Sequence, residues 1–572
     1  MTTRSARVRA PELVGRGGWI GTDAPLSLAG LRGRFVLLDF WTFCCVNCLH
    51  VLEELRVLEH QFADVLTVIG VHSPKFLHEA DHDAVVAAVE RYGVHHPVLD
   101  DPDLTTWKQY AVRAWPTLVL VDPEGYIVHV SSGEGHAEGI GKLLTELVAE
   151  HGAKGTLRPG DSPYVPPPPS VSELSFPGKA LLLPDGRLLV SDSSHDSVVI
   201  LDGEVVTRRF PGFLQPQGLC LHDGRVLVAD TGHHTVVGLD VESGDLEIVA
   251  GTGQVWRPGD ATSGPALQVN LSTPWDIGVW EDEVVIAMAG THQLHALREG
   301  LVRVLAGTTG EGLRDGPALS AYLAQPSGLA AGLDRLWFVD AETSALRAYR
   351  AGEVGTAVGT GLFDFGHRDG AAVGALLQHP LGVAVLPDGS VAVCDTYNGA
   401  VRRYDPATDT VSTLLAGLAE PSDAVVDGEH LLVVESAAHR VTRVLLPTEA
   451  LQVEGVAHRT QRPETVLGPG RVTLHVVFTP PPGQKLDDSY GPPTRLTVSG
   501  PLVVGGDGLS TDLTRDLVLE GEEGVLHVAA SAASCDVDAA SPACHVTRQD
   551  WGIPVRLVTG GPTELVLVLN GL

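Results

Sequence analysis

Apolar runs of strand length alternate with helix-length stretches from about residue 30 to residue 150. The strand-like runs are "FVLLDFWT", "VLTVIGVHS", "PTLVLVDPEG" and "YIVHV", and "IGKLLTELVAEHG" is the last helix-like stretch. Strands separated by helices in this way predict an α/β domain around a sheet, which we assign to residues 1–151. Residues 152–170 are rich in proline and glycine and predict a semi-rigid linker.

A different pattern covers residues 171–450, where strand-length runs and glycine turns follow one another without a long helical stretch. One unit recurs: a strand, a tight turn, a buried strand that ends in an aspartate, a polar turn and a further strand. We expect the aspartate to bond turn amides just past its strand. The clearest copies are "LLLPDGRLLVSDSSHDSVVILD", "LCLHDGRVLVADTGHHTVVGLD", "VAVLPDGSVAVCDTYNGAVRRYD" and "LAAGLDRLWFVDAETSALRAYR".

Two weaker copies bring the number of units to six, and each unit is preceded by a proline. These prolines are about 40 to nearly 60 residues apart, which is typical of propeller blades with loops of unequal length. The longer units carry insertions such as "GTTGEGLRDGPALSAYLAQPSGL", which we expect on one rim, where partners bind. The prolines are Pro177, Pro216, Pro274, Pro326, Pro380 and Pro421.

The last segment returns to short alternating strands without the blade unit. Its runs "RVTLHVVFT", "TRLTVSG", "GVLHVAASA" and "IPVRLV" predict a β-sandwich-like domain over residues 468–572. The fold class is therefore multidomain, α/β plus all-β: an α/β domain, a six-bladed β-propeller and a C-terminal β-sandwich-like domain.

Charge and composition exclude some partners for this chain of 572 residues. Its net charge of −32 opposes binding to nucleic acid and to anionic membranes, so we expect protein or small-molecule partners. The basic amino terminus is not followed by the apolar core of a secretory signal, which predicts a cytoplasmic location. Seven cysteines, unevenly placed, are too few for a disulfide framework and indicate redox chemistry or metal binding instead.

Three of the cysteines cluster in "FWTFCCVNCLH", where Cys45 and Cys48 form a C-x-x-C pair at a predicted strand-to-helix junction. The start of a helix directs free amides and the positive end of its dipole at the first cysteine, which stabilises a thiolate. The second cysteine lies one turn further and can resolve a mixed disulfide. A zinc site would need a second ligand pair at suitable spacing, and none follows.

The stretch "VLLDFWTFCCVNC" resembles the thioredoxin active site, in the helix-inserted form found in bacterial periplasmic thiol reductases. The resemblance implies a thioredoxin-like fold with Cys45 as nucleophile and Cys48 as resolving cysteine. It further implies that Asp39 is the buried proton-transfer residue and that Pro116, in "YAVRAWPTLVLVD", is the cis-proline that presents backbone to a substrate. Trp41 and Trp115 are expected to line the substrate groove.

The sequence departs from the thioredoxin pattern in three places. Val46-Asn47 stands between the cysteines instead of Gly-Pro, which alters the start of the helix and therefore the redox potential. Cys44 replaces the usual tryptophan before the nucleophile, and the bulky Trp115 before Pro116 could narrow the groove.

Cys44 leaves two further possibilities open. It could be an auxiliary redox thiol, or the three thiols with His50 could bind a thiophilic metal. His50 lies about 200° around the helix from Cys48, however, and should face away from it. An inert remnant of a redox site is a further alternative to the active pair. We expect no metal and no cofactor.

The order of the segments carries a second resemblance. A thioredoxin-like domain with a "CCxNC" site, a proline-rich linker, six NHL-type blades and a C-terminal β domain is similar to the NHL repeat-containing protein 2 family. This resemblance implies the architecture and a cytosolic location but supplies no reaction.

Two more cysteines, Cys535 and Cys544, lie in "SAASCDVDAASPACHVTRQDWGIPVRL". This stretch resembles the amino-terminal immunoglobulin-like domain of the membrane thiol reductant transporter, whose two cysteines exchange electrons with a thioredoxin-like partner. The resemblance implies a possible auxiliary redox pair that relays electrons to Cys45. A local disulfide or two quiet thiols is the alternative.

Two hypotheses for the function follow. In the first, the protein is a thiol-disulfide oxidoreductase that acts on protein thiols or disulfides, and its propeller recruits the client at the rim. In the second, the propeller is the working module of an interaction scaffold, and the thioredoxin-like domain is structural or a redox sensor.

Overall fold

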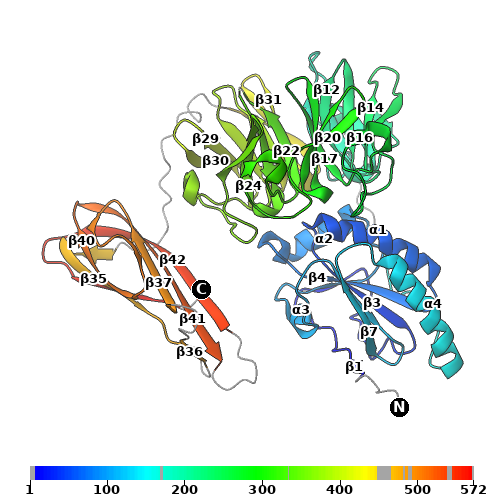
Figure 1. Cartoon of the computed structure of the whole chain (residues 1–572), viewed down its shortest axis with the longest axis horizontal. Coiled ribbons are helices and arrows are strands. Elements are labelled where there is room, and N and C mark those ends of the chain that lie inside the picture. Colours follow the sequence, from blue (N-terminus) through cyan, green and yellow to red (C-terminus); the bar gives the residue numbers. More distant parts are fainter. Residues whose placement is uncertain are drawn as a thin grey trace. The chain divides into compact units, whose positions relative to one another are not determined.

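The structure is a computed structural model that describes residues 7–167, 172–332, 334–446, 465–480, 484–486, 492–536 and 544–569. The chain forms two compact units, Met1–Val456 and Ala457–Leu572. The first unit holds the thioredoxin-like domain and the propeller, and the described residues of the second form strands and no helix (Figure 1).

The thioredoxin-like domain is built on a seven-stranded sheet with the strand order β1-β7-β6-β3-β4-β5-β2. The central strand β3 pairs in parallel with β4 and antiparallel with β6. Its strands are β1 (Val8–Arg9), β2 (Gly18–Ile20), β3 (Phe35–Trp41), β4 (Leu66–His72), β5 (Val98–Asp100), β6 (Thr117–Val121) and β7 (Tyr126–Ser132). Its helices are α1 (Val46–Gln61), α2 (His82–Arg91), α3 (Thr105–Gln109) and α4 (Ala137–Lys154).

All seven residues of β3 are buried because helices cover both faces of the sheet. Phe35 and Leu37 pack with α1 and α4, whereas Leu38 and Phe40 pack on the opposite face with the segment that includes α3. This alternation directs Asp39 to the face that α1 covers.

The segment predicted as a linker is partly held by the thioredoxin-like domain. Helix α4 continues to Lys154, beyond the predicted boundary at residue 151. Arg158 then donates its amide to the carbonyl of Gly33, and Val165 donates to Gly21. The stretch before residue 166 therefore lies against the domain, and residues 168–170 of the predicted linker lie outside the described residues.

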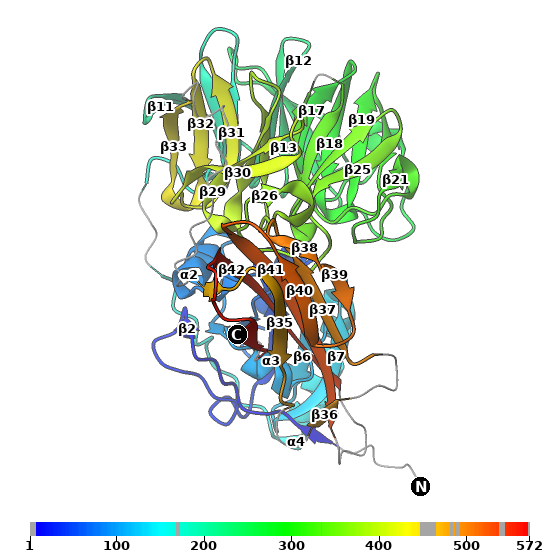
Figure 2. The same cartoon turned by 90° about the vertical axis from the view of Figure 1, so that its left-hand side faces the viewer.

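The propeller consists of six sheets in chain order, and the innermost strands of the six sheets are neighbours in a closed ring. Figure 2 shows the three strands of the last blade, β31, β32 and β33, side by side. The first three blades comprise β8 (Ala180–Leu182), β9 (Leu188–Asp192), β10 (Ser197–Asp202) and β11 (Val205–Pro211); β12 (Pro216–His222), β13 (Arg225–Asp230), β14 (Thr235–Leu239) and β15 (Leu246–Ala250); and β16 (Gly264–Pro265), β17 (Pro274–Trp280), β18 (Glu283–Met288), β19 (Gln293–Arg298) and β20 (Leu301–Ala306).

The last three blades comprise β21 (Gly316–Pro317), β22 (Pro326–Ala331), β23 (Leu336–Asp340), β24 (Ala345–Arg350) and β25 (Glu353–Val358); β26 (Gly370–Ala371), β27 (Gly382–Val385), β28 (Val391–Asp395), β29 (Ala400–Asp405) and β30 (Thr410–Ala416); and β31 (Pro421–Asp427), β32 (His430–Glu435) and β33 (Arg440–Leu445). Short 3-10 turns follow the second long strand of most blades, among them η4 (Ala289–Thr291) and η6 (Ala341–Thr343).

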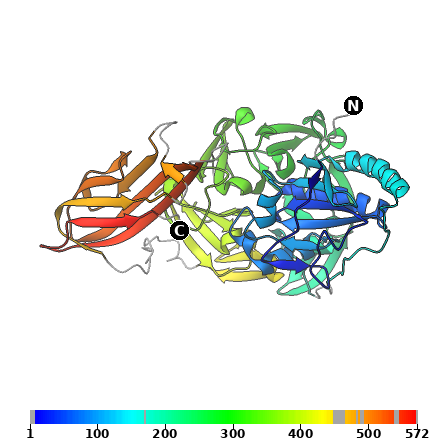
Figure 3. The same cartoon turned by 90° about the horizontal axis from the view of Figure 1, so that it is seen from below.

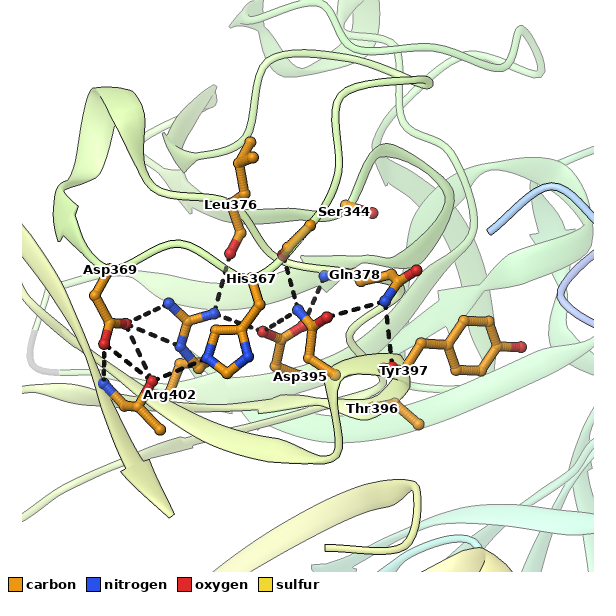
Figure 4. A network of polar contacts seen from close by, with 12 residues as sticks. Ser344, His367, Asp369, Leu376, Gln378, Asp395, Thr396, Tyr397 and Arg402 are labelled. Atoms are coloured by element: carbon orange, nitrogen blue, oxygen red, sulfur yellow. Dashed lines mark hydrogen bonds and ion pairs between the residues drawn. The ribbon is translucent and has the colours of Figure 1, made fainter. Parts of the chain in front are cut away.

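The acidic residue at the end of the buried strand bonds a different amide from the one the sequence predicted. Asp395 accepts from the amide of Gln378 at 2.6 Å, two residues before the blade proline, and also from the buried guanidinium of Arg402 (Figure 4). Because the chain enters the blade beside the end of this strand, the carboxylate holds an amide of the entry loop, and it also accepts from the side chain of Asn398 in the turn that follows. Asp192, Asp230, Asp340 and Glu435 make the equivalent bond in their blades.

A ring of six residues, one before each blade proline, has left-handed backbone without being glycine. Their φ angles lie between 43° and 63°. Non-glycine residues adopt this conformation at a cost, so the surrounding structure must hold them there. We call this set the pre-proline ring; it comprises Phe176, Gln215, Thr273, Gln325, His379 and Glu420.

Side chains of neighbouring blades hold the pre-proline ring in place. His234 Nδ1 accepts from the amide of Thr273 at 3.1 Å, and His292 Nδ1 accepts from Gln325 at 3.2 Å. Burial lowers the pKa of His234 to about 3, so its imidazole is neutral and can accept. The bond from Phe176 to His439 of the last blade, at 3.0 Å, closes the circle.

The second unit is a sandwich of two sheets around one hydrophobic core (Figure 3). One sheet has the order β34-β42-β41-β37-β39 with β36 beside β41, and the other has the order β38-β40-β35-β43. The strands are β34 (Thr465–Leu467), β35 (Gly470–Val477), β36 (Gln484–Leu486), β37 (Thr494–Ser499), β38 (Val503–Gly505), β39 (Gly508–Ser510), β40 (Thr514–Leu519), β41 (Glu523–Asp536), β42 (Cys544–Leu557) and β43 (Glu564–Val568).

Candidate functional site

Cys45 and Cys48 lie at the junction of β3 and α1, as the sequence predicted. Cys45 is the N-cap of α1, with an extended backbone, and its sulfur accepts from the amide of Cys48 at 3.3 Å. Cys45 is partly exposed, whereas Cys48 is fully buried. Burial raises the pKa of the Cys48 thiol, and its contact with Cys45 raises it further. Of the two cysteines, the partly exposed Cys45 is therefore the one placed to meet a substrate.

Asp39 lies in the core on the same face of the sheet as the cysteine pair, and its charge acts on the Cys48 thiol. Burial raises the pKa of Asp39 from 3.8 to about 8, and the charge of Glu59 contributes in the same direction. Neither carboxyl oxygen has a hydrogen-bond partner among the described residues. A carboxyl group with this pKa exists in both forms near neutral pH and can exchange protons in either direction.

The Trp115–Pro116 peptide bond is cis, and Pro116 is buried. The indole nitrogen of Trp115 donates to the carbonyl of Ser73 at 2.8 Å. Trp115 and Cys45 both pack against the core cluster that contains Cys48. The fold thus brings the loop before β6 to the cysteine pair.

The predicted place of Trp41 in a substrate groove is wrong. Trp41 is fully buried, and its ring meets the ring of His72 at 5.3 Å between centroids. It lies inside the core because it shares the helix-covered face of β3 with Asp39.

Cys44 lies at the contact with the propeller. Its carbonyl accepts from Gln325 of the propeller, and its thiol feels the charge of Glu342, which pairs with Lys75 of the thioredoxin-like domain. Burial, followed by the charges of Glu342 and Glu79, raises the pKa of the Cys44 thiol. Cys44 is therefore a protonated thiol at the contact of two domains, and a role as auxiliary redox thiol stays a prediction.

Gln325 of the pre-proline ring contacts the backbone on both sides of Cys45. Its Oε1 accepts from the amide of Val46 at 2.8 Å, and its Nε2 donates to the carbonyl of Cys44 at 2.9 Å. Gln325 is itself buried. No local sequence motif identifies Gln325 as part of the site, because it reaches the cysteine motif only through the packing of two domains.

Glu79 is a second residue that sequence reasoning missed. One of its carboxylate oxygens accepts from the Thr42 hydroxyl at 2.6 Å and from the Cys44 amide at 2.9 Å. The other accepts from the amides of Lys75 and Phe76, at 2.9 Å each. This fully buried carboxylate joins the loop before the cysteine pair to the loop after β4.

His50 faces away from the cysteine pair, as its helical position predicted. Its Nδ1 is 2.5 Å from a carboxylate oxygen of Glu134, and its Nε2 contacts the hydroxyl of Thr273 in the propeller. Among the described residues, the one group of three ligand atoms close enough for a metal is Asp122, Glu124 and His151. Arg7 already pairs with both carboxylates of that group. The cysteine cluster does not present a ligand set that includes His50.

A cavity of about 150 Å³ lies beside the cysteine motif, between α1 and the propeller. Leu49 and His50 line it from α1, and Tyr92 lines it from the turn after α2. Thr273 and Trp275 line it from the propeller. The cavity is large enough for a few water molecules or a small side chain.

Cys535 and Cys544 lie directly opposite each other in the antiparallel pair β41–β42. Their side chains are outside the described part of the structure. The register brings the two backbones within reach of one another, and a relay to Cys45 stays a prediction.

Family models match both domains of the first unit. The model for thioredoxin-like domains matches residues 33–127, which include the cysteine pair. The model for the NHL repeat matches residues 213–239 and 377–404, in the second and fifth blades.

NHL repeat-containing protein 2 of Gallus gallus is 34% identical over 486 residues, which cover 74% of this chain and 66% of that protein. The chain belongs to the NHL repeat-containing protein 2 family. Protein SUPPRESSOR OF QUENCHING 1, chloroplastic, of Arabidopsis thaliana is also 34% identical, over 475 residues that cover 75% of this chain. The matched region spans 45% of that plant protein's length.

The thioredoxin-like domain also has a relative with a named activity. Thiol-disulfide oxidoreductase YkuV of Bacillus subtilis is 21% identical over 140 residues, which cover 24% of this chain and 94% of that protein. Among the described residues, no helix is both long enough and apolar enough to cross a membrane.

Proposed function

We propose that this member of the NHL repeat-containing protein 2 family is a thiol-disulfide oxidoreductase whose nucleophile is Cys45. The observation that carries the proposal is the position of Cys45 as N-cap of α1, with the buried Asp39 acting on Cys48. Helix amides and dipole favour the thiolate at the first cysteine, and a carboxyl of pKa about 8 serves the second.

The proposed reaction balances as two thiol exchanges. The Cys45 thiolate attacks a client disulfide, whose S–S bond breaks while a bond forms between Cys45 and one client sulfur; the other leaves as a thiolate. Cys48 then gives its proton to Asp39 and attacks Cys45, which releases the second client sulfur and leaves the Cys45–Cys48 disulfide. A dithiol reductant restores the pair, and the same steps in reverse oxidise a client dithiol.

Single-turnover reduction tests the proposal. The reduced full chain is mixed with oxidised glutathione, and formation of the Cys45–Cys48 disulfide is followed by mass spectrometry. Cys45→Ser should abolish it, and Cys48→Ser should accumulate a glutathione adduct on Cys45. Cys394→Ser, a matched change at a thiol buried in the propeller, should leave the rate unchanged. Equal rates of glutathione reduction in Cys45→Ser and in the unaltered protein would refute the proposal that Cys45 is the nucleophile.

A second candidate function is a scaffold or redox sensor in which the propeller is the working module. Its support is the contact of the propeller with the cysteine loop, where Gln325 bonds the backbone of Cys44 and Val46 and the charge of Glu342 acts on the Cys44 thiol. In that case Cys45 and Cys48 would become oxidised to a disulfide, but the protein would not catalyse the reduction of client disulfides.

The Cys48→Ser variant can also identify the client, because it cannot resolve a mixed disulfide on Cys45. Cys48→Ser in cells should hold client proteins on Cys45 as mixed disulfides, and we expect proteins rather than nucleic acid or membrane, given the charge of −32. A disulfide from Cys45 to Cys535 or Cys544 would support the relay. The cytoplasm remains the proposed location, and the name of the plant relative places that protein in the chloroplast.

A further inference from the structure

The start of α1 directs several free amides toward Cys45, and the propeller occupies one of them. The Val46 amide donates to Gln325 Oε1 at 2.8 Å, and the Cys48 amide is shared between the sulfur and the carbonyl of Cys45. A helix start has four amides without a partner in the helix, and they are what stabilises an anion there. A residue almost 280 positions away in the chain thus controls part of the anion site.

Gln325 is built rigidly into its place. It is 4% exposed, its φ is 63°, and its own amide donates to His292 Nδ1 at 3.2 Å. Pro326 follows it directly and begins β22. Its amide group therefore reaches the cysteine loop from a fixed backbone, and both of its polar atoms are used.

The polarity of the contact has a defined electrostatic effect. The Gln325 oxygen is the negative end of an amide dipole, and it lies against the positive end of α1 one residue from Cys45. This oxygen competes with a Cys45 thiolate for the positive potential at the start of α1. The Nε2 of Gln325 holds the Cys44 carbonyl, and this fixes the position of the loop before Cys45.

We propose that Gln325 is a positioning residue for Cys45: it holds the backbone on both sides of the nucleophile and sets how strongly α1 stabilises its thiolate. The inference rests on the proposed role of Cys45 as nucleophile. It makes the propeller part of the redox site rather than only a platform for clients.

Two substitutions in the full chain test the proposal. For each variant, the rate at which iodoacetamide alkylates Cys45 is measured by mass spectrometry at a series of pH values. Gln325→Glu keeps the shape and puts a carboxylate beside the Val46 amide. The rate at pH 7 should fall about tenfold, because only the thiolate reacts and a nearby negative charge opposes it. Gln325→Met removes both polar atoms, frees the Val46 amide, and should raise the rate about threefold.

Gln378→Glu is the matched control. Gln378 is another buried propeller glutamine whose Oε1 accepts from an amide of the thioredoxin-like domain, that of Leu77 at 2.9 Å. Its contact lies away from the start of α1, so the alkylation rate of Cys45 should stay within about twofold. A rate that falls equally in Gln325→Glu and Gln378→Glu, or rates that do not separate Gln325→Glu from Gln325→Met, would overturn the proposal.

The outcome is independent of turnover. Alkylation reports on the thiolate even if Cys45 reduces no disulfide, so failure of the oxidoreductase proposal and failure of the Gln325 proposal give different results. If Cys45 is alkylated faster in Gln325→Met but the protein does not reduce oxidised glutathione, the Gln325 proposal is retained and the oxidoreductase proposal is rejected.

Discussion

Asp39 is a buried carboxyl group without a hydrogen-bond partner among the described residues, and such a group opposes folding whenever it is ionised. Its pKa in the folded protein is about 8, against 3.8 ordinarily. Below pH 4 both the folded and the unfolded states hold the proton, and no cost arises. Between pH 4 and pH 8 the unfolded state ionises while the folded state does not, so the penalty grows as pH rises.

Asp39→Asn should therefore stabilise the protein at neutral pH while it impairs turnover. The expected gain in the free energy of unfolding is about 4 kcal/mol at pH 7, because the neutral amide removes the ionisation that favours the unfolded state. Urea titrations of the two proteins measure it. The same comparison at pH 4 is the control and should show no difference; a constant gain at both pH values would contradict the pKa assignment.

At the residue scale, sequence reasoning located the part of the site that one continuous motif encodes. Cys45 and Cys48 stand in the motif, and Pro116 was placed by its resemblance to the cis-proline loop. Gln325 and Glu79 could not be found in this way, because each is an ordinary polar residue whose partner is brought near only by tertiary packing. Cys44 was visible in the sequence, but its contact with Gln325 of the propeller was not.

Helix α2 ends against the pre-proline ring, and its last residue provides a buried ion pair between the two domains. Arg91 pairs with Glu420, which also accepts from His78 at 2.8 Å, and the Arg91 guanidinium lies 4.6 Å from the ring of Phe176. Burial alone would raise the pKa of Glu420, but the charge of Arg91 and the bond from His78 outweigh burial and lower it to about 2. The pair therefore stabilises the fold above pH 4.5 and loses this contribution as pH falls from 4.5 toward 2.

Glu420→Gln should cost about 3 kcal/mol of unfolding free energy at pH 7, because it leaves the Arg91 charge buried without its partner. Urea unfolding, followed in the full chain, measures this loss. Glu138→Gln on α4 is the control, since Glu138 pairs with Lys142 in solvent and such pairs contribute little. An equal loss in both variants would indicate that burial of the ion pair is irrelevant.

At the element scale, the sequence predicted elements that are long or repeated. The blades recur with a period, and β3 and β4 are apolar runs, so their patterns stand out. Strands β1 and β2 were not predicted because two or three residues at a sheet edge carry no measurable alternation. The recurring aspartates were recognised as structural, but their partner amides lie across the blade and could not be read from spacing.

The first unit unites two domains through polar contacts and through an apolar cluster that includes Tyr397 and Phe365 of the propeller, whereas the second unit has its own core of buried residues from both sheets. Five of the six pre-proline residues bond or stack with the thioredoxin-like domain. Strained backbone that is retained at such positions usually serves a contact or a site. These contacts give a reason for the same unfavourable conformation to be kept at five blade entries whose side chains differ.

Cys44 reports whether the two domains of the first unit are in contact. It is 4% exposed and its carbonyl accepts from Gln325 of the propeller, so an alkylating reagent can reach its thiol only after the domains separate. In the unaltered protein, Cys44 should be alkylated at least a hundred times more slowly than Cys45, which is partly exposed. The Glu420→Gln variant shifts the equilibrium toward separation by about 3 kcal/mol, and this corresponds to a roughly hundredfold faster reaction of Cys44.

Cys394 separates this opening from unfolding of the propeller. It lies in β28 with no exposed surface and has no part in the contact between domains. If the domains separate as folded bodies, Glu420→Gln accelerates alkylation of Cys44 and leaves Cys394 unreactive over the same time. Parallel acceleration of both thiols would mean that the propeller itself unfolds, and an unchanged Cys44 would mean that Arg91 and Glu420 do not hold the domains together.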